Sequence, residues 1–285
     1  MSKPRDRFAK VKMCGETYTA RYWDTGKSAA NYLPVVAIPG LMGYIEEWLP
    51  TLDVLSPLLR TIVIDPLGCG LSDKPEKGDY SLRGLALFIK SVLDELEISR
   101  AHLVGHSYGG AQMLALARAF PEMCESLVLV TPAGVAKNLG WILRMMTIPW
   151  LGELLSAPSR LASTVTMRMQ IYDKRLVTRE LIDIDQHYTS LPGEHRAALK
   201  TLREGCTIFG QKKETYRANE PFLGNPQNRI LIVLGNKDPL IQSPTKRAIE
   251  KRFPHVQLKV YENCSHTPML EKPEFNEFLL TFFRQ

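Results

Sequence analysis

The sequence lacks the cysteine patterns of a disulfide framework or a zinc site. Its cysteines are odd in number, lie far apart and include no CxxC pair: Cys14, Cys69, Cys124, Cys206 and Cys264. Free thiols of this kind are typical of a reducing compartment. The sequence also shows no metal-ligand motif, and the glycines at 68–70 are not followed by the Lys-Ser/Thr pair of a phosphate-binding loop. We therefore expect no metal and no cofactor.

Long apolar runs are missing as well. The longest ones, at 127–130 and 230–235, are far shorter than the roughly 20 residues of a membrane-spanning helix. The basic segment near the N-terminus has no apolar stretch behind it, so it does not resemble a signal peptide. These absences predict a protein without a membrane span, located in the cytoplasm.

Long runs of one charge are also absent. The 285 residues carry 36 Lys and Arg against 30 Asp and Glu, a formal net charge of +6. Because the basic residues are scattered and are not interleaved with aromatic ones, we expect no nucleic-acid partner. With 45% hydrophobic and 23% charged residues, the chain has the composition of a globular protein with a sizeable core.

What is present is an alternation of short apolar runs with segments of helical spacing. The expected strands cover 17–24, 33–40, 60–70, 101–107, 125–134, 229–238 and 256–262. The expected helices cover 46–59, 81–98 with Ser81 as N-cap, 109–120, 243–253 and 273–283. We expect the first two strands to form an edge hairpin. The remainder predicts an α/β fold, with a mostly parallel, twisted sheet and helices on both faces.

The alternation breaks between residues 135 and 217. This stretch is helical, rich in Met and Trp, interrupted by prolines and without a clear strand. We interpret it as a helical cap inserted into a core formed by 1–134 and 218–285. The stretch carries more basic than acidic residues, which leaves open whether its surface meets an anionic substrate or is merely solvated.

The segment with the strongest chemical signal reads Gly-His-Ser-Tyr-Gly at 105–109. It matches the pattern G-x-S-x-G and lies between an expected strand and an expected helix. Such a tight turn needs small residues on both sides of the nucleophile, whose own backbone is strained. Ser107 would then stand above the sheet, with the N–H of Tyr108 directed at a developing oxyanion. The alternative is an ordinary turn in which Ser107 only caps the helix.

A serine hydroxyl needs a base, and the base needs an acid that orients it. His266 is the candidate base, because it lies in a polar loop after the last expected strand, at the same sheet edge as Ser107. Asp238 closes the hydrophobic run before that strand and is the candidate acid, although it also fits a cap for the turn before Pro239. The chain order Ser107, Asp238, His266 is the one used by the hydrolases that carry G-x-S-x-G.

The other histidines fit structural roles. They lie inside an expected strand, in the helical insertion, at a strand start or beside the nucleophile: His102, His187, His195, His255 and His106. As the direct neighbour of Ser107, His106 should point away from it.

A second oxyanion donor is expected in the loop after the strand at 33–40. Gly40 and Gly43 allow the backbone to turn close to the nucleophile, and the N–H of Leu41 is the candidate donor. A loop with a purely structural role is the alternative, since Pro-Gly turns are common.

Together these segments resemble the α/β-hydrolase superfamily, in particular its helical-capped branch of small esterases, cofactor-free haloperoxidases, carbon–carbon bond hydrolases and epoxide hydrolases. The stretch DPLGCGLSDKP at 65–75 is similar to the D-x-x-G-x-G-x-S segment of that branch. The stretch PGLMGYIEEW at 39–48 is similar to its H-G-x-x-G oxyanion loop, with Pro39 where the branch usually has histidine. A serine in the elbow argues against a dehalogenase or an epoxide hydrolase, which use an aspartate there.

The resemblance implies a serine hydrolase that cleaves carboxylic esters through an acyl-enzyme intermediate. Two alternatives stay open: a carbon–carbon bond hydrolase of the same fold acting on a ring-cleavage diketone, and a small-ligand receptor without catalysis.

The substrate pocket is expected between the oxyanion loop and the cap. Large, polarisable side chains offer adaptable apolar contact there. The candidates in this class are Met42, Trp141, Met145 and Met146, with Trp150, Met167 and Met169 as further cap residues of the same kind. For each of the cap residues, packing in the core of the cap is the alternative role. The expected partner is a small-molecule ester, and the protein is expected to be a monomer or a homodimer.

Overall fold

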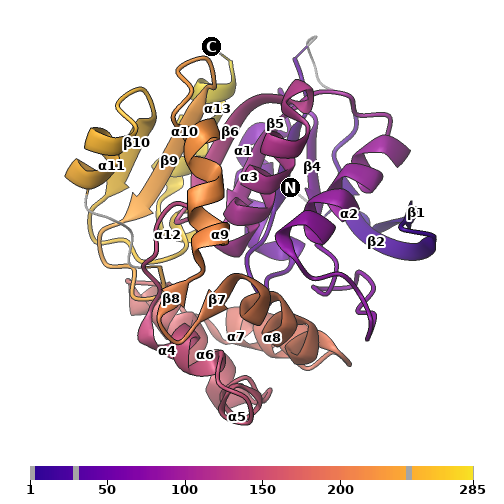
Figure 1. The fold of residues 1–285 in the computed structure, drawn as a ribbon, viewed down its shortest axis with the longest axis vertical. Coiled ribbons are helices and arrows are strands. Elements are labelled where there is room, and N and C mark those ends of the chain that lie inside the picture. Colours follow the sequence, from indigo (N-terminus) through magenta and orange to yellow (C-terminus); the bar gives the residue numbers. More distant parts are fainter. Residues whose placement is uncertain (1–3, 28–31, 242–245, 285) are drawn as a thin grey trace.

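The structure, a computed structural model, describes residues 4–27, 32–241 and 246–284. Its centre is an eight-stranded sheet with the strand order β1-β2-β4-β3-β5-β6-β9-β10 (Figure 1). From β4 to β10 all neighbouring strands are parallel, which confirms the predicted mostly parallel sheet. The strands are β1 (Arg7–Met13), β2 (Glu16–Asp24), β3 (Val35–Ile38), β4 (Thr61–Ile64), β5 (Ala101–His106), β6 (Cys124–Val130), β9 (Ile230–Gly235) and β10 (Gln257–Tyr261).

Helices cover both faces of the sheet because the parallel strands are apolar on both sides. On one face, Val36, Ile38 and Leu103 belong to a core with α2 (Leu82–Glu95), α3 (Tyr108–Ala119), α10 (Glu220–Leu223) and α11 (Lys246–Arg252). On the other face, Val35 and Val104 belong to a core with η1 (Ile45–Trp48), α1 (Leu49–Leu55), α12 (Pro268–Glu271) and α13 (Pro273–Phe283). Successive side chains of a strand point to opposite faces of the sheet, so neighbouring residues of one strand belong to different cores.

The start of α2 follows its capping signal. The side chain of Ser81 accepts a hydrogen bond from the N–H of Gly84 at 3.1 Å, so the predicted N-cap of α2 is confirmed. The expected start of the helix at 243 lies outside the described residues. Among the described helices, none is long and apolar enough to cross a membrane.

The expected pairing of strands 17–24 and 33–40 is wrong. β2 pairs antiparallel with β1 on one side and with β4 on the other, so β4 separates β2 from β3. Cys14 and Gly15 connect β1 to β2, and both have a positive φ, of 52° and 87°. Two such residues form the tight turn whose twist suits a hairpin, which explains why the hairpin forms one strand earlier than predicted.

Between β6 and β9 the chain forms the helices α4 (Trp141–Met146), α5 (Leu151–Leu155), α6 (Arg160–Gln170), α7 (Arg179–Thr189) and α8 (Glu194–Gly205), then α9 (Lys213–Tyr216). The described residues also form the short 3-10 helices η2 (Pro121–Met123) before β6, η3 (Lys174–Leu176) between α6 and α7, and η4 (Arg217–Asn219) between α9 and α10. Figure 1 shows α4 to α8 gathered at one end of the molecule. The expectation of no strand here is wrong in one place, because β7 (Cys206–Thr207) and β8 (Gly210–Gln211) form a two-residue antiparallel pair.

Candidate active site

The turn that carries Ser107 joins β5 to α3 in a strained conformation. Ser107 has φ 53° and ψ −121°, a region that non-glycine residues rarely occupy. The surrounding backbone holds it there: its N–H donates to the carbonyl of Val130, and its own carbonyl accepts from the N–H groups of Gly110 and Ala133, each at 2.9 Å. Strain that is fixed by several bonds is typical of a functional turn.

The glycines of the motif are required by close backbone contacts. A Cβ at Gly105 would lie 2.4 Å from the carbonyl oxygen of Gly109. A Cβ at Gly109 would lie 2.3 Å from the carbonyl oxygen of Pro39, which belongs to the next loop. Neither contact leaves room for a side chain, so the G-x-S-x-G pattern follows from packing at this turn.

His266 and Asp238 meet at the same edge of the sheet. Nδ1 of His266 lies 2.7 Å from Oδ2 of Asp238, and both side chains are almost fully buried. Oδ1 of Asp238 accepts hydrogen bonds from the backbone N–H groups of Leu240 and Ile241, at 2.8 and 3.1 Å. The carboxylate therefore accepts a hydrogen bond from Nδ1–H of His266. This leaves Nε2 as the ring nitrogen that can exchange a proton with a reacting group.

The backbone of the His266 loop is held by groups that the sequence did not single out. The carbonyl of His266 accepts from Nε2 of His106 at 2.9 Å and from the hydroxyl of Thr131 at 2.8 Å. The N–H of His266 donates to the carbonyl of Gln170, at the end of α6, at 2.8 Å. The loop is thus anchored from the core on one side and from the helical insertion on the other.

His106 is positioned between two acceptors. Its Nδ1 lies 3.0 Å from a carboxylate oxygen of Glu47, and its Nε2 faces the His266 carbonyl, so both ring nitrogens are used away from Ser107 as expected. Burial opposes the charged form of His106, but the adjacent Glu47 carboxylate raises its pKa above the usual value. Two acceptors and a raised pKa favour the imidazolium.

The loop after β3 approaches the elbow closely. A Cβ at Gly40 would lie 3.0 Å from Cβ of Ser107, and Gly43 donates its N–H to the carbonyl of Gly40 at 3.1 Å. Leu41 lines the same cavity as Ser107, and Tyr108 forms the first residue of α3. Pro39 supports this arrangement, since its carbonyl lies against Gly109. The structure brings both predicted oxyanion donors to the edge of the sheet where Ser107 lies.

A cavity of about 720 Å³ extends from Ser107 and His266 into the helical insertion. Met42 and Met146, two of the predicted substrate contacts, line it, as do Met167 and Met169. Its walls are largely apolar, and the insertion contributes Leu143, Ala162, Val165, Leu181, Ile184 and Leu202 among others.

Two of the predicted substrate contacts lie elsewhere. Trp141 is 68% exposed, and neither Trp141 nor Met145 lines the cavity. The reason is the helical period of α4, which turns Ile142 and Met146 inward and places Trp141 and Met145, four residues apart, on another face. Trp150 is also exposed, at 87%.

Apart from His106, which is paired with Glu47, the charged residues that line the cavity are acidic. Among the described residues, Glu46, Glu47, Glu180 and Asp185 line it, and no Lys or Arg does. Asp185 projects from α7 and is buried, which raises its pKa to about 6 against the opposing effect of a hydrogen bond with Ser163. At neutral pH its carboxylate makes this part of the cavity unfavourable for a second negative charge.

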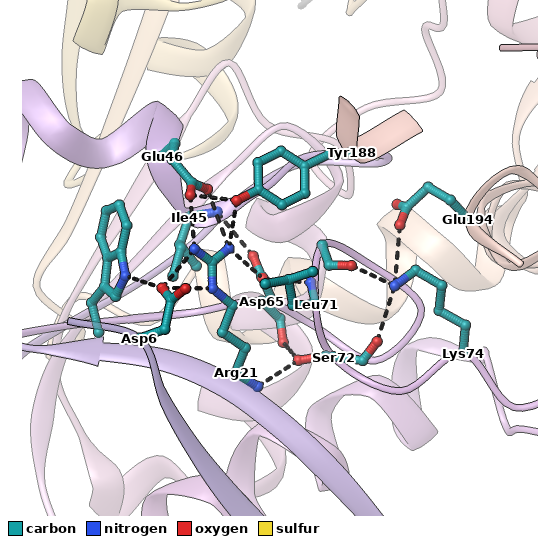
Figure 2. A network of polar contacts seen from close by, with 12 residues as sticks. Asp6, Arg21, Ile45, Glu46, Asp65, Leu71, Ser72, Lys74, Tyr188 and Glu194 are labelled. Carbon is teal, nitrogen blue, oxygen red and sulfur yellow. Dashed lines mark hydrogen bonds and ion pairs between the residues drawn. The ribbon is translucent and has the colours of Figure 1, made fainter. Parts of the chain in front are cut away.

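A buried ion network stands beside the site (Figure 2). The guanidinium of Arg21, on β2, pairs with Asp6 and Glu46 at 2.7 Å each and with Asp65 at 3.2 Å. Tyr188, on α7, donates its hydroxyl to Glu46 and accepts from Arg21 at 3.1 Å. Sequence reasoning missed Arg21, because its charged partners are separated from it along the chain and no motif connects them.

Asp65 extends this network to two loops at the sheet edge. It follows β4 and accepts hydrogen bonds from the N–H groups of Ile45 and Leu71, each at 2.9 Å. A Cβ at Gly70, which has φ 56°, would lie 2.1 Å from Oδ2 of Asp65. The carboxylate thus fixes the start of η1 and the segment 65–75, and it requires the glycine at position 70.

These features define a class of protein. A strained serine between strand and helix, a carboxylate-bound histidine and a close glycine loop all lie at the carboxyl ends of parallel strands, where α/β sheets place their chemistry. Such an arrangement is typical of a hydrolase with a nucleophile elbow.

The chain belongs to the alpha/beta hydrolase fold family, whose pattern matches residues 34–273. It is 31% identical over 248 residues to the dihydrolipoyllysine-residue acetyltransferase component of an acetoin cleaving system from Cupriavidus necator, covering 86% of this chain but only 62% of that protein. It is 29% identical over 263 residues to a 2-hydroxy-6-oxononadienedioate/2-hydroxy-6-oxononatrienedioate hydrolase from Comamonas testosteroni, covering 91% of this chain and 89% of that protein.

Solved structures show the same fold. A meta-cleavage product hydrolase from Pseudomonas fluorescens IP01 superimposes with a TM-score of 0.79 at 24% identity, over 97% of each chain. This likeness concerns the fold, and the chemistry of the present chain is argued from its own residues.

Proposed function

We propose that the protein is a serine hydrolase in which Ser107 is the nucleophile, His266 the general base and Asp238 the residue that orients His266. One observation carries the proposal: a serine in a strained elbow and a histidine bound to a buried carboxylate line the same apolar cavity. A receptor that kept only the fold would have no use for either the strain or the paired carboxylate.

In the proposed mechanism, Nε2 of His266 takes the hydroxyl proton while Oγ of Ser107 attacks the carbonyl carbon of the substrate. Asp238 holds the proton on Nδ1 and stabilises the imidazolium that forms. The N–H groups of Leu41 and Tyr108 bind the oxyanion, helped by the dipole of α3. The proton then passes to the leaving group, an acyl-enzyme remains, and a water activated by His266 releases the acid.

Two kinds of bond suit this machinery, and different observations favour each. Relatives named as hydrolases of an oxo-dienedioate and of a meta-cleavage product favour hydrolysis of a carbon–carbon bond. The cavity favours a neutral ester, because Asp185 lies in its wall and the described residues that line it include no Lys or Arg. The imidazole of His106 also lines the cavity, but Glu47 and the carbonyl of His266 already occupy its two ring nitrogens. A carboxylate placed there would lose its hydration without gaining a cationic partner.

We therefore propose a carboxylic ester with a neutral, apolar acyl or aryl group as the preferred substrate. Cleavage of an anionic ring-cleavage diketone is the second candidate.

The role of Ser107 is tested by Ser107→Ala with a p-nitrophenyl ester and with a fluorophosphonate probe. We expect kcat/KM to fall by roughly a thousandfold or more, since the residual rate comes from the oxyanion donors and binding alone. Labelling should disappear as well. The matched control is Ser91→Ala on α2, which does not line the cavity and should keep both activities. Labelling of the Ser107→Ala protein would contradict the assignment.

The role of Asp185 is tested with two esters of equal length, one ending in a methyl group and one in a carboxylate. We expect the native protein to prefer the ester that ends in a methyl group. Asp185→Asn should raise the kcat/KM of the carboxylate-terminated ester, relative to that of the methyl-terminated one, by roughly tenfold, because it removes the repulsion between two negative charges in a partly polar site. A ring-cleavage dienoate is assayed beside them. Faster turnover of the dienoate than of either ester would favour the second candidate.

A further inference from the structure

The helical insertion exposes large apolar side chains at one end of the molecule. Within the described residues, every exposed large hydrophobic side chain except Phe8 lies between 141 and 209. We use the term apolar rim for those on or beside α4, α5 and α6: Trp141, Trp150, Leu154, Leu155, Leu161 and Val165. In Figure 1 these three helices lie at the end of the molecule opposite the C-terminus.

The apolar rim is continuous with the cavity. Leu154, Leu155, Leu161 and Val165 are exposed and also line the cavity that contains Ser107. The short connection from α5 to α6 lines it too, at 156–159. The cavity therefore opens onto the α5–α6 part of the apolar rim, whereas Trp141 and Trp150 lie outside its lining.

Trp150 is exposed at an energetic cost. The residue is 87% exposed, and its backbone has φ 68° and ψ −46°, a conformation that is unusual for a bulky residue. Trp150 is the N-cap of α5, and its carbonyl accepts a hydrogen bond from the N–H of Leu154 at 3.1 Å. A conformation that costs free energy and also leaves an indole in water has no benefit for the isolated protein.

A basic side chain, Arg168, accompanies the apolar ones on α6. On α6, Leu161, Val165 and Arg168 follow at intervals of four and three residues, so they share one exposed face, while Ser163 and Met167 face inward. Exposed Trp and Leu beside Arg are the composition of surfaces that lie in the interface of a membrane.

We propose that the apolar rim docks on an anionic lipid surface, from which an apolar substrate enters the cavity. A lipid surface covers the rim without sealing it, whereas a second copy of the chain or another protein would close the entrance to Ser107. Indole rings suit the boundary between headgroups and acyl chains, and Arg168 supplies attraction to anionic headgroups. Docking does not depend on the proposed hydrolysis; only the delivery of substrate does.

The test uses the full chain with Ser107→Ala, so that no lipid is hydrolysed, and sedimentation with vesicles of phosphatidylcholine with or without phosphatidylglycerol. We expect binding to the anionic vesicles and a blue shift of tryptophan fluorescence. The shift reports on the rim, because Trp23 and Trp48 are fully buried and only Trp141 and Trp150 can change their surroundings. Arg168→Glu should weaken binding to the anionic vesicles.

Adding Trp141→Ser and Trp150→Ser should weaken binding by roughly tenfold or more, since interfacial binding scales with buried apolar area. The matched control is Phe8→Ser, which removes a side chain that is 55% exposed on β1 and should change nothing. In the catalytically intact chain, the two Trp changes should leave hydrolysis of a soluble ester unchanged, because neither residue lines the cavity.

Absence of binding to both kinds of vesicle would overturn the proposal, even if the soluble ester is hydrolysed. The same holds if the Trp variants bind as well as the parent, or if the rim instead forms a dimer that the Trp substitutions dissociate in analytical ultracentrifugation.

Discussion

His106 connects the elbow to the histidine loop at the scale of single residues. It precedes Ser107 in the chain, yet its ring bonds to Glu47 from η1 and to the carbonyl of His266. The same carbonyl accepts from Thr131, the residue after β6. Two side chains, from β5 and from the residue after β6, thus hold one backbone oxygen of the proposed base, and Glu47 holds one of them. We infer that His106 is a positioning residue, which keeps the ring of His266 in reach of Ser107.

We expect His106→Gln to lower kcat by roughly tenfold to a hundredfold, because a small displacement of the base is enough to slow proton transfer. KM should stay nearly constant, since the apolar walls of the cavity are unaffected. Steady-state kinetics and fluorophosphonate labelling rates check this.

Thr131→Val is the companion variant, because it removes the other hydrogen bond to the same carbonyl. The two changes should be non-additive in kcat, as expected for groups that hold one atom together. Loss of thermal stability with an unchanged kcat would instead show a purely structural role for His106.

Sequence reasoning singles out residues that a local pattern marks and passes over those whose partners are distant along the chain. Ser107 is marked by its flanking glycines, and Asp238 and His266 by their positions after strands. Arg21 and Glu47 carry no such mark, because their partners lie dozens of residues away. Trp141 shows the opposite error, since its residue type suggests a pocket wall while the period of a short helix turns it outward.

At the scale of elements, β2 and all the parallel strands were predictable, whereas β1, β7 and β8 were not. β4, β5, β6 and β9 are almost wholly buried, so their sequences are mostly apolar. β1 alternates buried residues with exposed Lys and therefore resembles a polar segment, although its period of two is regular. β7 and β8 are two residues each, too short for any period to be seen.

The docking of α8 on the core depends on a buried carboxyl group. Glu194, the first residue of α8, is fully buried and lies 3.5 Å from Nζ of Lys74, which also donates to the carbonyl of Gly70. Burial raises the pKa of Glu194 to about 8, while Lys74 opposes the shift. The folded state therefore favours the protonated form. The stability that comes from proton binding at Glu194 is fully present below the pKa that this group has in the unfolded chain, and it is lost as pH rises toward 8.

We expect Glu194→Gln to stabilise the protein, and to do so more at pH 8 than at pH 5.5. Between these pH values the free energy of unfolding of the native protein falls by about 1.4 kcal/mol per pH unit because of Glu194. A neutral amide of similar shape has no such pH dependence. Thermal unfolding of both proteins at the two pH values checks the difference.

The matched control for this experiment is Glu76→Gln. Its carboxylate is largely exposed and pairs with Arg196, which also belongs to α8. Its effect should be small and nearly the same at both pH values. A pH-independent difference between native and Glu194→Gln proteins would contradict the raised pKa.

At the scale of the whole molecule, one guanidinium joins parts that the sequence separates widely. Arg21 lies on β2, far from the elbow in the strand order, yet it contacts the start of η1 through Glu46, the loop after β4 through Asp65, and α7 through Tyr188 (Figure 2). The oxyanion loop precedes η1 directly, so its position depends on this network. The helical insertion is thereby coupled to the same loop that is proposed to bind the oxyanion.

Tyr188→Phe isolates that coupling, because the change removes one hydroxyl and keeps the ring, which stacks on Tyr44 at 4.6 Å. The hydroxyl donates to Glu46 and accepts from Arg21, so both charged groups lose a buried partner. We expect the free energy of unfolding to fall by about 1–3 kcal/mol, the cost of leaving buried polar groups less well paired. Hydrogen exchange should accelerate most in α7.

Tyr172→Phe, at a residue that is 43% exposed, is the control and should leave both measurements unchanged. Faster exchange spread evenly over the sheet would mean that the network stabilises the core as a whole, and unchanged stability would mean that the insertion docks without it.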